Sequence, residues 1–137
     1  MLLDYSFGII PLRKKESRWE VFLIQHRNGS HWGFPKGHKE EDEDFLLSAQ
    51  RELKEETNLT VDKFLDINHF EEEYIYERDG KYLKKVTYVC ALVKGDIKLQ
   101  ENEILDGRWV FLEKAKDLIT FQGSKSIADK LSIVLKA

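Results

Sequence analysis

A chain of 137 residues with 42% hydrophobic and 12% aromatic side chains has the length of one domain and enough apolar surface for a core. Its formal net charge of −3 argues against a surface that binds nucleic acids by general neutralisation of phosphates, so any phosphate site has to be local. The only cysteine has no partner for a disulfide within the chain, which is typical of a reducing compartment.

The N-terminal run MLLDYSFGII has an acidic residue where a signal peptide carries basic ones. No stretch of the sequence approaches the ~20 consecutive apolar residues that a helix needs to span a membrane. We therefore expect one domain over residues 1–137, located in the cytoplasm and without a membrane partner.

Runs rich in β-branched and aromatic residues predict strands in the first part of the chain. The first strand covers Tyr5–Leu12 and should be broken at Pro11, because proline cannot donate to a sheet ladder. The second covers Trp19–His26, where nearly continuous apolar residues indicate burial on both faces. A helix should then cover Glu43–Thr57, or begin one residue earlier, with acidic residues at the end that the helix dipole favours.

Alternating apolar and polar residues predict further strands in the second half of the chain, and Asp79-Gly80 is a strong hairpin signal between two of them. Glu113–Ile119 should form a short helical turn, and Ser124–Leu135 the last helix, with Ser124 as its N-cap. The strands predicted here are Val61–His69, Phe70–Glu77, Tyr82–Val93, Ile97–Leu99 and Arg108–Leu112. Strands interleaved with two substantial helices indicate an α/β or α+β fold with a mixed sheet.

The first predicted helix carries an unusual density of carboxylates. Glu52, Glu55 and Glu56 fall on one face at spacings of three and four residues. A solvated surface helix whose glutamates are balanced by Arg51 and Lys54 is the plain alternative, but two cations do not cancel three carboxylates so close together. A divalent cation that prefers oxygen ligands, such as Mg²⁺, would relieve their repulsion.

The turn before this helix has features suited to a phosphate group. Gly33 and Gly37 permit close approaches that a side chain would block. Lys36 and His38 supply donors that are compatible with phosphate oxygens.

The residues from this turn to the end of the helix resemble the signature of the Nudix hydrolases. That signature reads Gly, five residues, Glu, seven residues, Arg-Glu, an aliphatic residue, any residue, Glu-Glu, any residue, Gly and an aliphatic residue. The matching positions are Gly37, Glu43, Arg51, Glu52, Leu53, Glu55, Glu56, Asn58 and Leu59. Asn58 replaces the last glycine of the signature, and asparagine is the non-glycine residue best suited to a left-handed helix end. The resemblance implies the Nudix fold, a mixed β-sheet sandwiched between α-helices.

The resemblance also implies roles for the carboxylates. Glu52 and Glu56 would be the principal ligands of a Mg²⁺ ion, for which Mn²⁺ could substitute, and the Gly37 carbonyl would be another oxygen ligand. Glu55 would be a further ligand or a partner of one. Lys36 would help to offset the charge of the reacting phosphates.

Other residues complete the implied site. Glu43 and Arg51 would be structural, as a pair that holds the turn on the helix. Glu103, in the acidic loop before the last strand, is the best candidate for one more metal ligand or the general base, and Glu101 competes with it. The base role stays open between Glu103, Glu55 and Glu52.

The flanks are similar to those of the asymmetric diadenosine tetraphosphate hydrolases. The similar runs are HWGFPKGH, residues 31–38, and KKVTY, residues 84–88. This resemblance implies that the polyphosphate is contacted by His31, Lys36, His38 and Lys84. Tyr88, which shares a strand face with Lys84, and Phe121 would be stacking surfaces for a base. Without the resemblance, these would more plainly be turn, sheet and surface residues.

The expected activity is therefore Mg²⁺-dependent cleavage of diadenosine tetraphosphate into ATP and AMP. The partner would be a small dinucleoside polyphosphate, with no stable nucleic-acid partner. The alternatives are removal of pyrophosphate from RNA 5′ ends and hydrolysis of diphosphoinositol polyphosphates, which the weakly acidic charge disfavours. A non-catalytic module that senses a nucleotide is disfavoured by the intact carboxylates.

Overall fold

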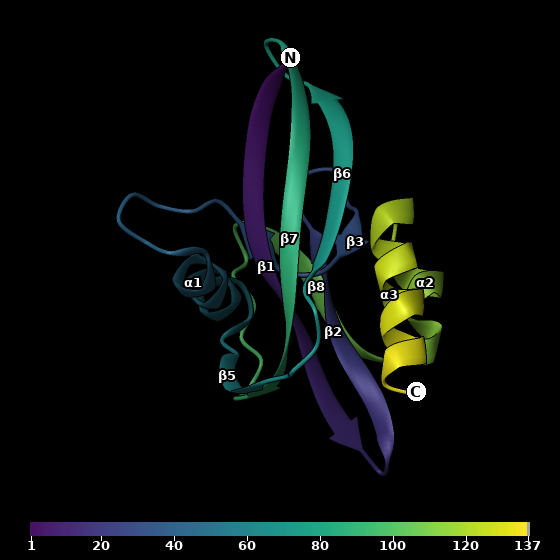
Figure 1. Ribbon diagram of the computed structural model, residues 1–137. Coiled ribbons are helices and arrows are strands. Elements are labelled where there is room, and N and C mark those ends of the chain that lie inside the picture. Colours follow the sequence, from purple (N-terminus) through teal and green to yellow (C-terminus); the bar gives the residue numbers. More distant parts are fainter. Residues whose placement is uncertain (137) are drawn as a thin grey trace.

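A mixed sheet with helices on both of its faces forms the centre of the molecule (Figure 1). The computed structural model describes residues 1–136. The strands are β1 Leu2–Lys15, β2 Arg18–His26, β3 Trp32–Gly33, β4 Lys36–Gly37, β5 Thr60–Phe64, β6 Phe70–Glu77, β7 Lys81–Lys94 and β8 Ile104–Phe111. The helices are α1 Phe45–Thr57, the 3₁₀ turn η1 Leu112–Lys114, α2 Ala115–Leu118 and α3 Gln122–Val134.

The sheet follows the order β3-β2-β1-β7-β5, with β4 paired to β1, β6 to β7 and β8 to β2. The long strands β1 and β7 run parallel from Leu2 opposite Tyr82 to Leu12 opposite Leu92. All the other pairs are antiparallel. β1, β7 and β6 extend side by side beyond the helices, towards the N-terminus in Figure 1.

The core has one apolar layer on each face of the sheet because successive strand residues point to opposite faces. Ile9 packs in the layer that contains Ala49 and Leu53 of α1. Ile10, its neighbour on β1, packs in the layer that contains Ile127 and Leu131 of α3. The prediction of a mixed sheet sandwiched between helices is confirmed.

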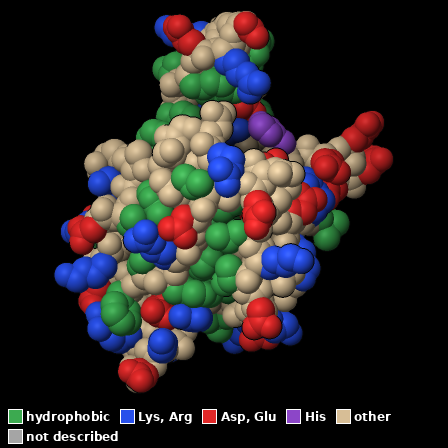
Figure 2. Space-filling view, turned by 180° about the vertical axis from the view of Figure 1, so that it is seen from behind, with side chains coloured by type: hydrophobic (Ala, Val, Ile, Leu, Met, Phe, Trp, Pro, Cys, Tyr) green, Lys and Arg blue, Asp and Glu red, His purple; other side chains and the backbone are tan. Residues whose placement is uncertain are grey.

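The surface mixes both signs of charge. On the face shown in Figure 2, acidic and basic side chains are interspersed with hydrophobic ones, and no basic stripe crosses it. The loop before α1 stands out from the body of the molecule with acidic side chains at its tip (Figure 2). Within residues 1–136, no helix combines the length and the apolar character that crossing a membrane requires.

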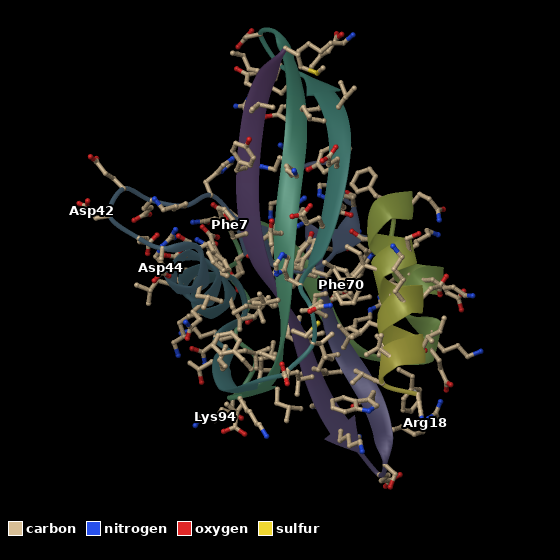
Figure 3. The ribbon with its side chains drawn as sticks, in the orientation of Figure 1. Phe7, Arg18, Asp42, Asp44, Phe70 and Lys94 are labelled. Carbon is tan, nitrogen blue, oxygen red and sulfur yellow. The ribbon has the colours of Figure 1, made fainter. Side chains whose placement is uncertain are left out.

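The ends of α1 follow from two side chains. The helix begins at Phe45 rather than Glu43, because Asp44 is the N-cap and accepts a hydrogen bond from the Leu47 amide at 2.8 Å. Asp44 lies where the exposed loop enters the helix, whereas Phe7 projects from β1 on the α1 side of the sheet (Figure 3). Asn58 ends the helix in the left-handed region with φ 71°, so the expectation that asparagine replaces glycine there is confirmed.

Two predictions near strand and helix ends were wrong. β1 continues through Pro11, which lies where the strand changes partner from β4 to β2, so no ladder bond on that side requires its missing N–H. α3 begins at Gln122 with Phe121 as N-cap. Ser124 does not cap the helix, because its hydroxyl instead donates to the buried Glu72 at 2.7 Å.

The second half differs from prediction mainly in strand limits. β5 ends at Phe64, after a register shift between Val61 and Lys63, so the rest of the predicted strand is irregular. β8 begins at Ile104, before the predicted start. The segment 97–99 is not a strand; its Lys98 amide bonds to the end of α1 instead.

Candidate active site

A cavity of about 370 Å³ lies where the turn around β4, helix α1 and the loop before β8 meet. It is surrounded by residues of both signs of charge. The sequence-predicted residues that line it are Lys36, Gly37, His38, Arg51, Glu52, Glu56, Lys84 and Glu103. His26, Ser6 and Glu40 also line it and were not predicted. Segments far apart in the sequence thus place carboxylates and basic side chains that could bind phosphate around one cavity.

Glu56 is the most unusual carboxylate in this cavity. Glu56 is 3% exposed, and among residues 1–136 its buried Oε1 has no hydrogen-bond partner. Burial first, and then the nearby charges of Glu52 and Glu103, raise the pKa of Glu56 to about 9, although the Lys36 amide bonds to it. Burial also raises the pKa of Glu52. A buried oxygen without a partner, beside other carboxylates, is the arrangement expected of a cation ligand.

This pKa predicts a pH-dependent stability of the metal-free protein. The pKa of Glu56 is about 9 in the folded state, above the ordinary value of 4.5. At pH values between these two, the folded state binds more protons than the unfolded chain. The stabilisation is complete below the unfolded pKa and is lost as pH rises through the folded one. We expect the Tm in a chelator to fall from about pH 6 to about pH 9 more steeply for the wild type than for Glu56→Gln. Parallel thermal-melting curves of the two proteins would contradict this.

Gly37 is required by the path of the Glu52 side chain. A Cβ at Gly37 would lie 2.0 Å from Glu52 Cδ and 2.3 Å from Glu52 Oε1. Gly33, predicted to have a similar role, is different, because a Cβ there would meet nothing within 4 Å. Only the second glycine of the turn gives a carboxylate room.

Arg51 connects the turn to the helix. Its Nε donates to Glu43 Oε2 at 3.0 Å, and its Nη2 donates to the His38 carbonyl at 3.1 Å. Its Nη1 donates to Glu52 at 3.1 Å and to Glu55 at 3.3 Å. The contact expected between Arg51 and Glu43 is therefore present, and the guanidinium also partly neutralises two of the carboxylates.

The donor set suits a hard divalent cation that retains water. Among residues 1–136, no three His, Cys, Asp or Glu side chains stand close enough together to enclose an ion as they lie. The unpaired Glu56 oxygen and the neighbouring Glu52 supply the oxygen ligands that Mg²⁺ and Mn²⁺ prefer. Mg²⁺ keeps several waters and is commonly completed by substrate phosphates, so an incomplete protein shell fits it.

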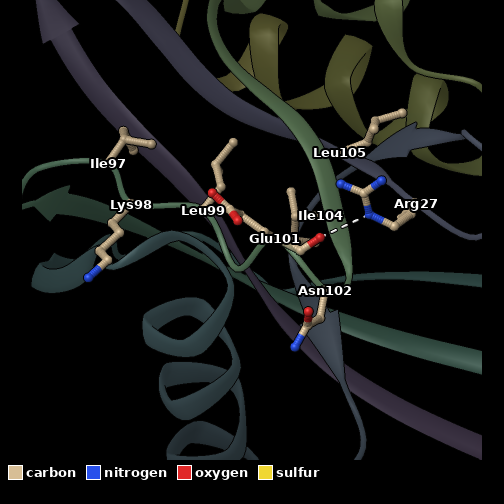
Figure 4. A pocket seen from close by; sticks show the side chains of 8 residues that line it. All are labelled: Arg27, Ile97, Lys98, Leu99, Glu101, Asn102, Ile104 and Leu105. Atoms are coloured by element: carbon tan, nitrogen blue, oxygen red, sulfur yellow. Dashed lines mark hydrogen bonds between the residues drawn. The ribbon is translucent and has the colours of Figure 1, made fainter.

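The acidic loop places its two candidate glutamates differently. Glu103 lines the cavity with Glu52 and Glu56. Glu101 lines a separate cavity of about 890 Å³, where its carbonyl accepts a hydrogen bond from Arg27 Nε at 2.9 Å (Figure 4). The Arg27 amide also donates to the Glu103 carbonyl at 2.8 Å. Arg27, which carries no sequence signal of this role, thus holds the loop at two points.

Lys36, His38 and Lys84, which could donate hydrogen bonds to a phosphate, line the same cavity as the helix carboxylates. The Lys36 ammonium donates to the Tyr74 hydroxyl at 3.0 Å, and burial lowers the pKa of Lys36. The Lys84 ammonium, on β7, lies 3.2 Å from His38 Nε2. The cavity therefore combines carboxylates that could hold a cation with basic groups that could bind a phosphate chain.

Tyr88 is not a stacking surface, so that prediction was wrong. Its side chain is 1% exposed, packs edge-on to Phe34 with ring centroids 5.3 Å apart, and donates to Glu72 at 3.2 Å. Tyr88 does share a strand face with Lys84, but its part of that face belongs to the core layer that includes α3 residues. The covering helix could not be located from the strand pattern alone.

Tyr74, missed in the sequence, stands where Tyr88 was expected to act. Its ring is nearly parallel to that of the half-exposed Phe121, at 15° and 6.1 Å between centroids. The His31 ring also packs against Phe121, with 5.1 Å between centroids, and stacks on His26 at 4.5 Å. The available signal was the register of the hairpin, which pairs Tyr74 with Lys84.

Both histidines of this group are neutral near pH 7. Burial first, and then the charges of His31 and Lys36, lower the pKa of His26 to about 4. Burial, followed by the charge of Lys36, also lowers the pKa of His31. His31 therefore lies beside the aromatic rings as an uncharged donor, in a cavity that shares His26 and Glu103 with the first.

Comparison with known proteins identifies the family. The family model described as NUDIX domain matches residues 2–131. The asymmetrical bis(5′-nucleosyl)-tetraphosphatase of Caenorhabditis elegans is 32% identical over 131 residues, which cover 93% of this chain and 94% of the relative. The Mus musculus protein of the same name is 36% identical over 130 residues, which cover 91% of this chain and 86% of the relative.

Solved structures agree with this assignment. The crystal structure of C. elegans Ap4A hydrolase matches with a TM-score of 0.76 and 31% identity, over 98% of this chain and 99% of that chain. The NUDIX domain of Shewanella oneidensis NrtR, solved with ADP ribose, matches with a TM-score of 0.75 at 15% identity, which supports the fold alone. The architecture is the Nudix fold, of the α+β class. This chain belongs to the Nudix hydrolase family.

Proposed function

We propose that this protein hydrolyses diadenosine tetraphosphate (Ap4A) asymmetrically, to ATP and AMP, with Mg²⁺ as cofactor. One observation carries the proposal: the similarity to asymmetrical bis(5′-nucleosyl)-tetraphosphatases extends over more than nine-tenths of the chain, at 32% and 36% identity. The cavity supports it, because the buried Glu56 and further carboxylates line it together with basic groups that could bind phosphate. Mn²⁺ would be a substitute metal.

In this proposal the carboxylates hold the metal. Glu52, Glu56 and Glu103, with the Gly37 carbonyl, would be its ligands, and Glu55 a weaker one because its exposed side chain bonds to Arg51. The bound cation would neutralise phosphate oxygens and lower the pKa of a water molecule. Glu43 and Arg51 would hold the turn on the helix.

A general base and the residues that donate hydrogen bonds to phosphate complete the reaction scheme. Glu103 is our choice for the group that takes a proton from the attacking water, because among residues 1–136 its carboxylate makes no hydrogen bond, whereas Arg51 engages Glu52. Lys36, His38 and Lys84 would bind the phosphate chain through charge-assisted hydrogen bonds. These contacts would place the chain between the cations and the metal.

The exposed ring of Phe121 would stack on an adenine, with Tyr74 beside it and His31 as a neighbouring donor. Stacking on an aromatic ring contributes about 1–3 kcal/mol per base. We expect Phe121→Ala to raise KM for Ap4A about tenfold while changing inhibition by inorganic tripolyphosphate less than about twofold. Phe64→Ala, which removes a partly exposed ring of β5, is the matched control. Equal losses for both ligands would exclude stacking.

The test of the activity is a product assay on Ap4A in ¹⁸O-water with Mg²⁺. Equal amounts of ATP and AMP support the proposal, and the labelled product shows which phosphorus is attacked. ADP as the only product would mean symmetric cleavage. An intact substrate would reject the proposal and favour the other Nudix activities, although the net charge of −3 and the mixed charges in Figure 2 do not suit RNA or inositol polyphosphates.

A further inference from the structure

Asp4 lies on β1 between two cavities. The parallel register of β1 and β7 sets it beside Lys84, which lines the active-site cavity with His38. Asp4 and His38 also line a neighbouring cavity of about 330 Å³, which extends towards the tip of the β6–β7 hairpin at Tyr82. Asp4 is outside the Nudix signature, and it reaches the site only through the pairing of strands distant in sequence.

Three donors converge on the Asp4 carboxylate. Its Oδ2 accepts hydrogen bonds from the Tyr76 hydroxyl at 2.6 Å and from Lys84 Nζ at 3.1 Å. Its Oδ1 lies 2.8 Å from His38 Nε2. Because a carboxylate only accepts, this last contact places a hydrogen on Nε2.

The carboxylate is the shared acceptor of two neighbouring donor groups. Lys84 Nζ and His38 Nε2 are 3.2 Å apart, yet both direct hydrogens towards Asp4. The Lys84 side chain is only 8% exposed, so water cannot replace the carboxylate freely. Burial acts to raise the pKa of Asp4, but hydrogen bonds from Tyr76, Lys84 and His38 outweigh it and lower the pKa to about 2.

We infer that Asp4 is a positioning residue, whose carboxylate fixes the Lys84 ammonium and the His38 ring at the phosphate-binding side of the active-site cavity. The inference rests on the proposed function for the identity of its ligand, a phosphate chain. A positioning role and a purely electrostatic effect of Asp4 predict opposite changes in polyphosphate affinity when the carboxylate is removed. Removing an anion from a polyphosphate site should strengthen binding by simple Coulomb attraction, whereas removing the group that positions two donors should weaken it.

The experiment measures binding of inorganic tripolyphosphate by isothermal titration calorimetry at one fixed Mg²⁺ concentration. We expect Asp4→Asn to weaken binding about tenfold and to raise KM for Ap4A by a similar factor, with kcat within about twofold of the wild type. Asp4→Glu keeps the charge, so it should retain most of the affinity. If Asp4→Asn does not fold, Asp4→Ser provides the test, because it also removes the carboxylate, and in that case binding at wild-type strength together with an unchanged KM overturns the inference.

Asp79→Asn is the matched control, because Asp79 lines the same 330 Å³ cavity. Among residues 1–136, Asp79 makes no hydrogen bond or ion pair with Lys84 or His38. It should bind tripolyphosphate as the wild type does. In a Lys84→Met background, Asp4→Asn should cause little further loss, because it acts partly through Lys84. Melting temperatures establish that each variant is folded.

Several outcomes would overturn the inference. They are unchanged or tighter binding by Asp4→Asn, an equal loss in Asp79→Asn, full additivity with Lys84→Met, and a wild type that does not bind tripolyphosphate. A wild type that binds tripolyphosphate but leaves Ap4A intact would reject the proposed function alone. The positioning role would then stand for whichever polyphosphate the site cleaves.

Discussion

Glu56→Gln should lower kcat for Ap4A hydrolysis by about two to three orders of magnitude and leave the protein folded. The loss should be large because the substitution removes charge from the carboxylate whose buried Oε1 has no hydrogen-bond partner in the described part of the chain and is free to bind a cation. The fold survives because the amide is nearly the same shape as the carboxyl group. Burial already raises the pKa of Glu56 to about 9, so the metal-free protein accommodates an uncharged group there. Steady-state kinetics at saturating Mg²⁺, beside a thermal melt, measure both effects.

The comparison among the helix carboxylates makes this result specific. Glu55→Gln should cost less, because half of the Glu55 side chain is exposed and it bonds to Arg51. Glu41→Gln, in the exposed loop before α1, removes the same charge outside the cavity and should have no effect. Equal losses in all three variants would indicate a general field effect. Wild-type turnover by Glu56→Gln would remove Glu56 from the metal site.

The sequence predicted the site best where it is built from local structure. Glu52 and Glu56 lie four residues apart on one helix, so the spacing alone sets them on the same face, and both line the cavity. Asn58 could be predicted as the helix end from its intrinsic tolerance of the left-handed region. Each of these features is determined within a few residues of the chain.

The remaining features depend on pairings between distant segments. Asp4 and Lys84 meet because β1 and β7 are parallel and in one particular register. Tyr88 is buried because α3 packs over its part of the strand, although it shares a strand face with Lys84 as the alternation predicts. Arg27 holds the loop of Glu103 through backbone carbonyls. Every residue has a carbonyl, so the sequence does not indicate these contacts.

We expect Gly37→Ala to lower kcat/KM for Ap4A about a hundredfold, because it should displace a predicted ligand from the cavity. The new methyl carbon would lie 2.0 Å from Glu52 Cδ and 2.4 Å from Glu52 Cγ. These atoms belong to a flexible side chain, so Glu52 moves and the backbone keeps its course. The unfolding free energy should change by no more than about 1 kcal/mol, measured by chemical denaturation.

Gly33→Ala is the matched control, because a Cβ at Gly33 meets nothing within 4 Å and Glu52 keeps its position. The double variant Gly37→Ala/Glu52→Gln then isolates the cause. If the alanine acts by displacing Glu52, its effect largely disappears once the carboxylate is gone, since one ligand cannot be lost twice. Additive losses, or an equal loss in Gly33→Ala, would mean that the alanine distorts the turn itself. A non-additive result would instead mean that the role of Gly37 is to leave room for the Glu52 carboxylate.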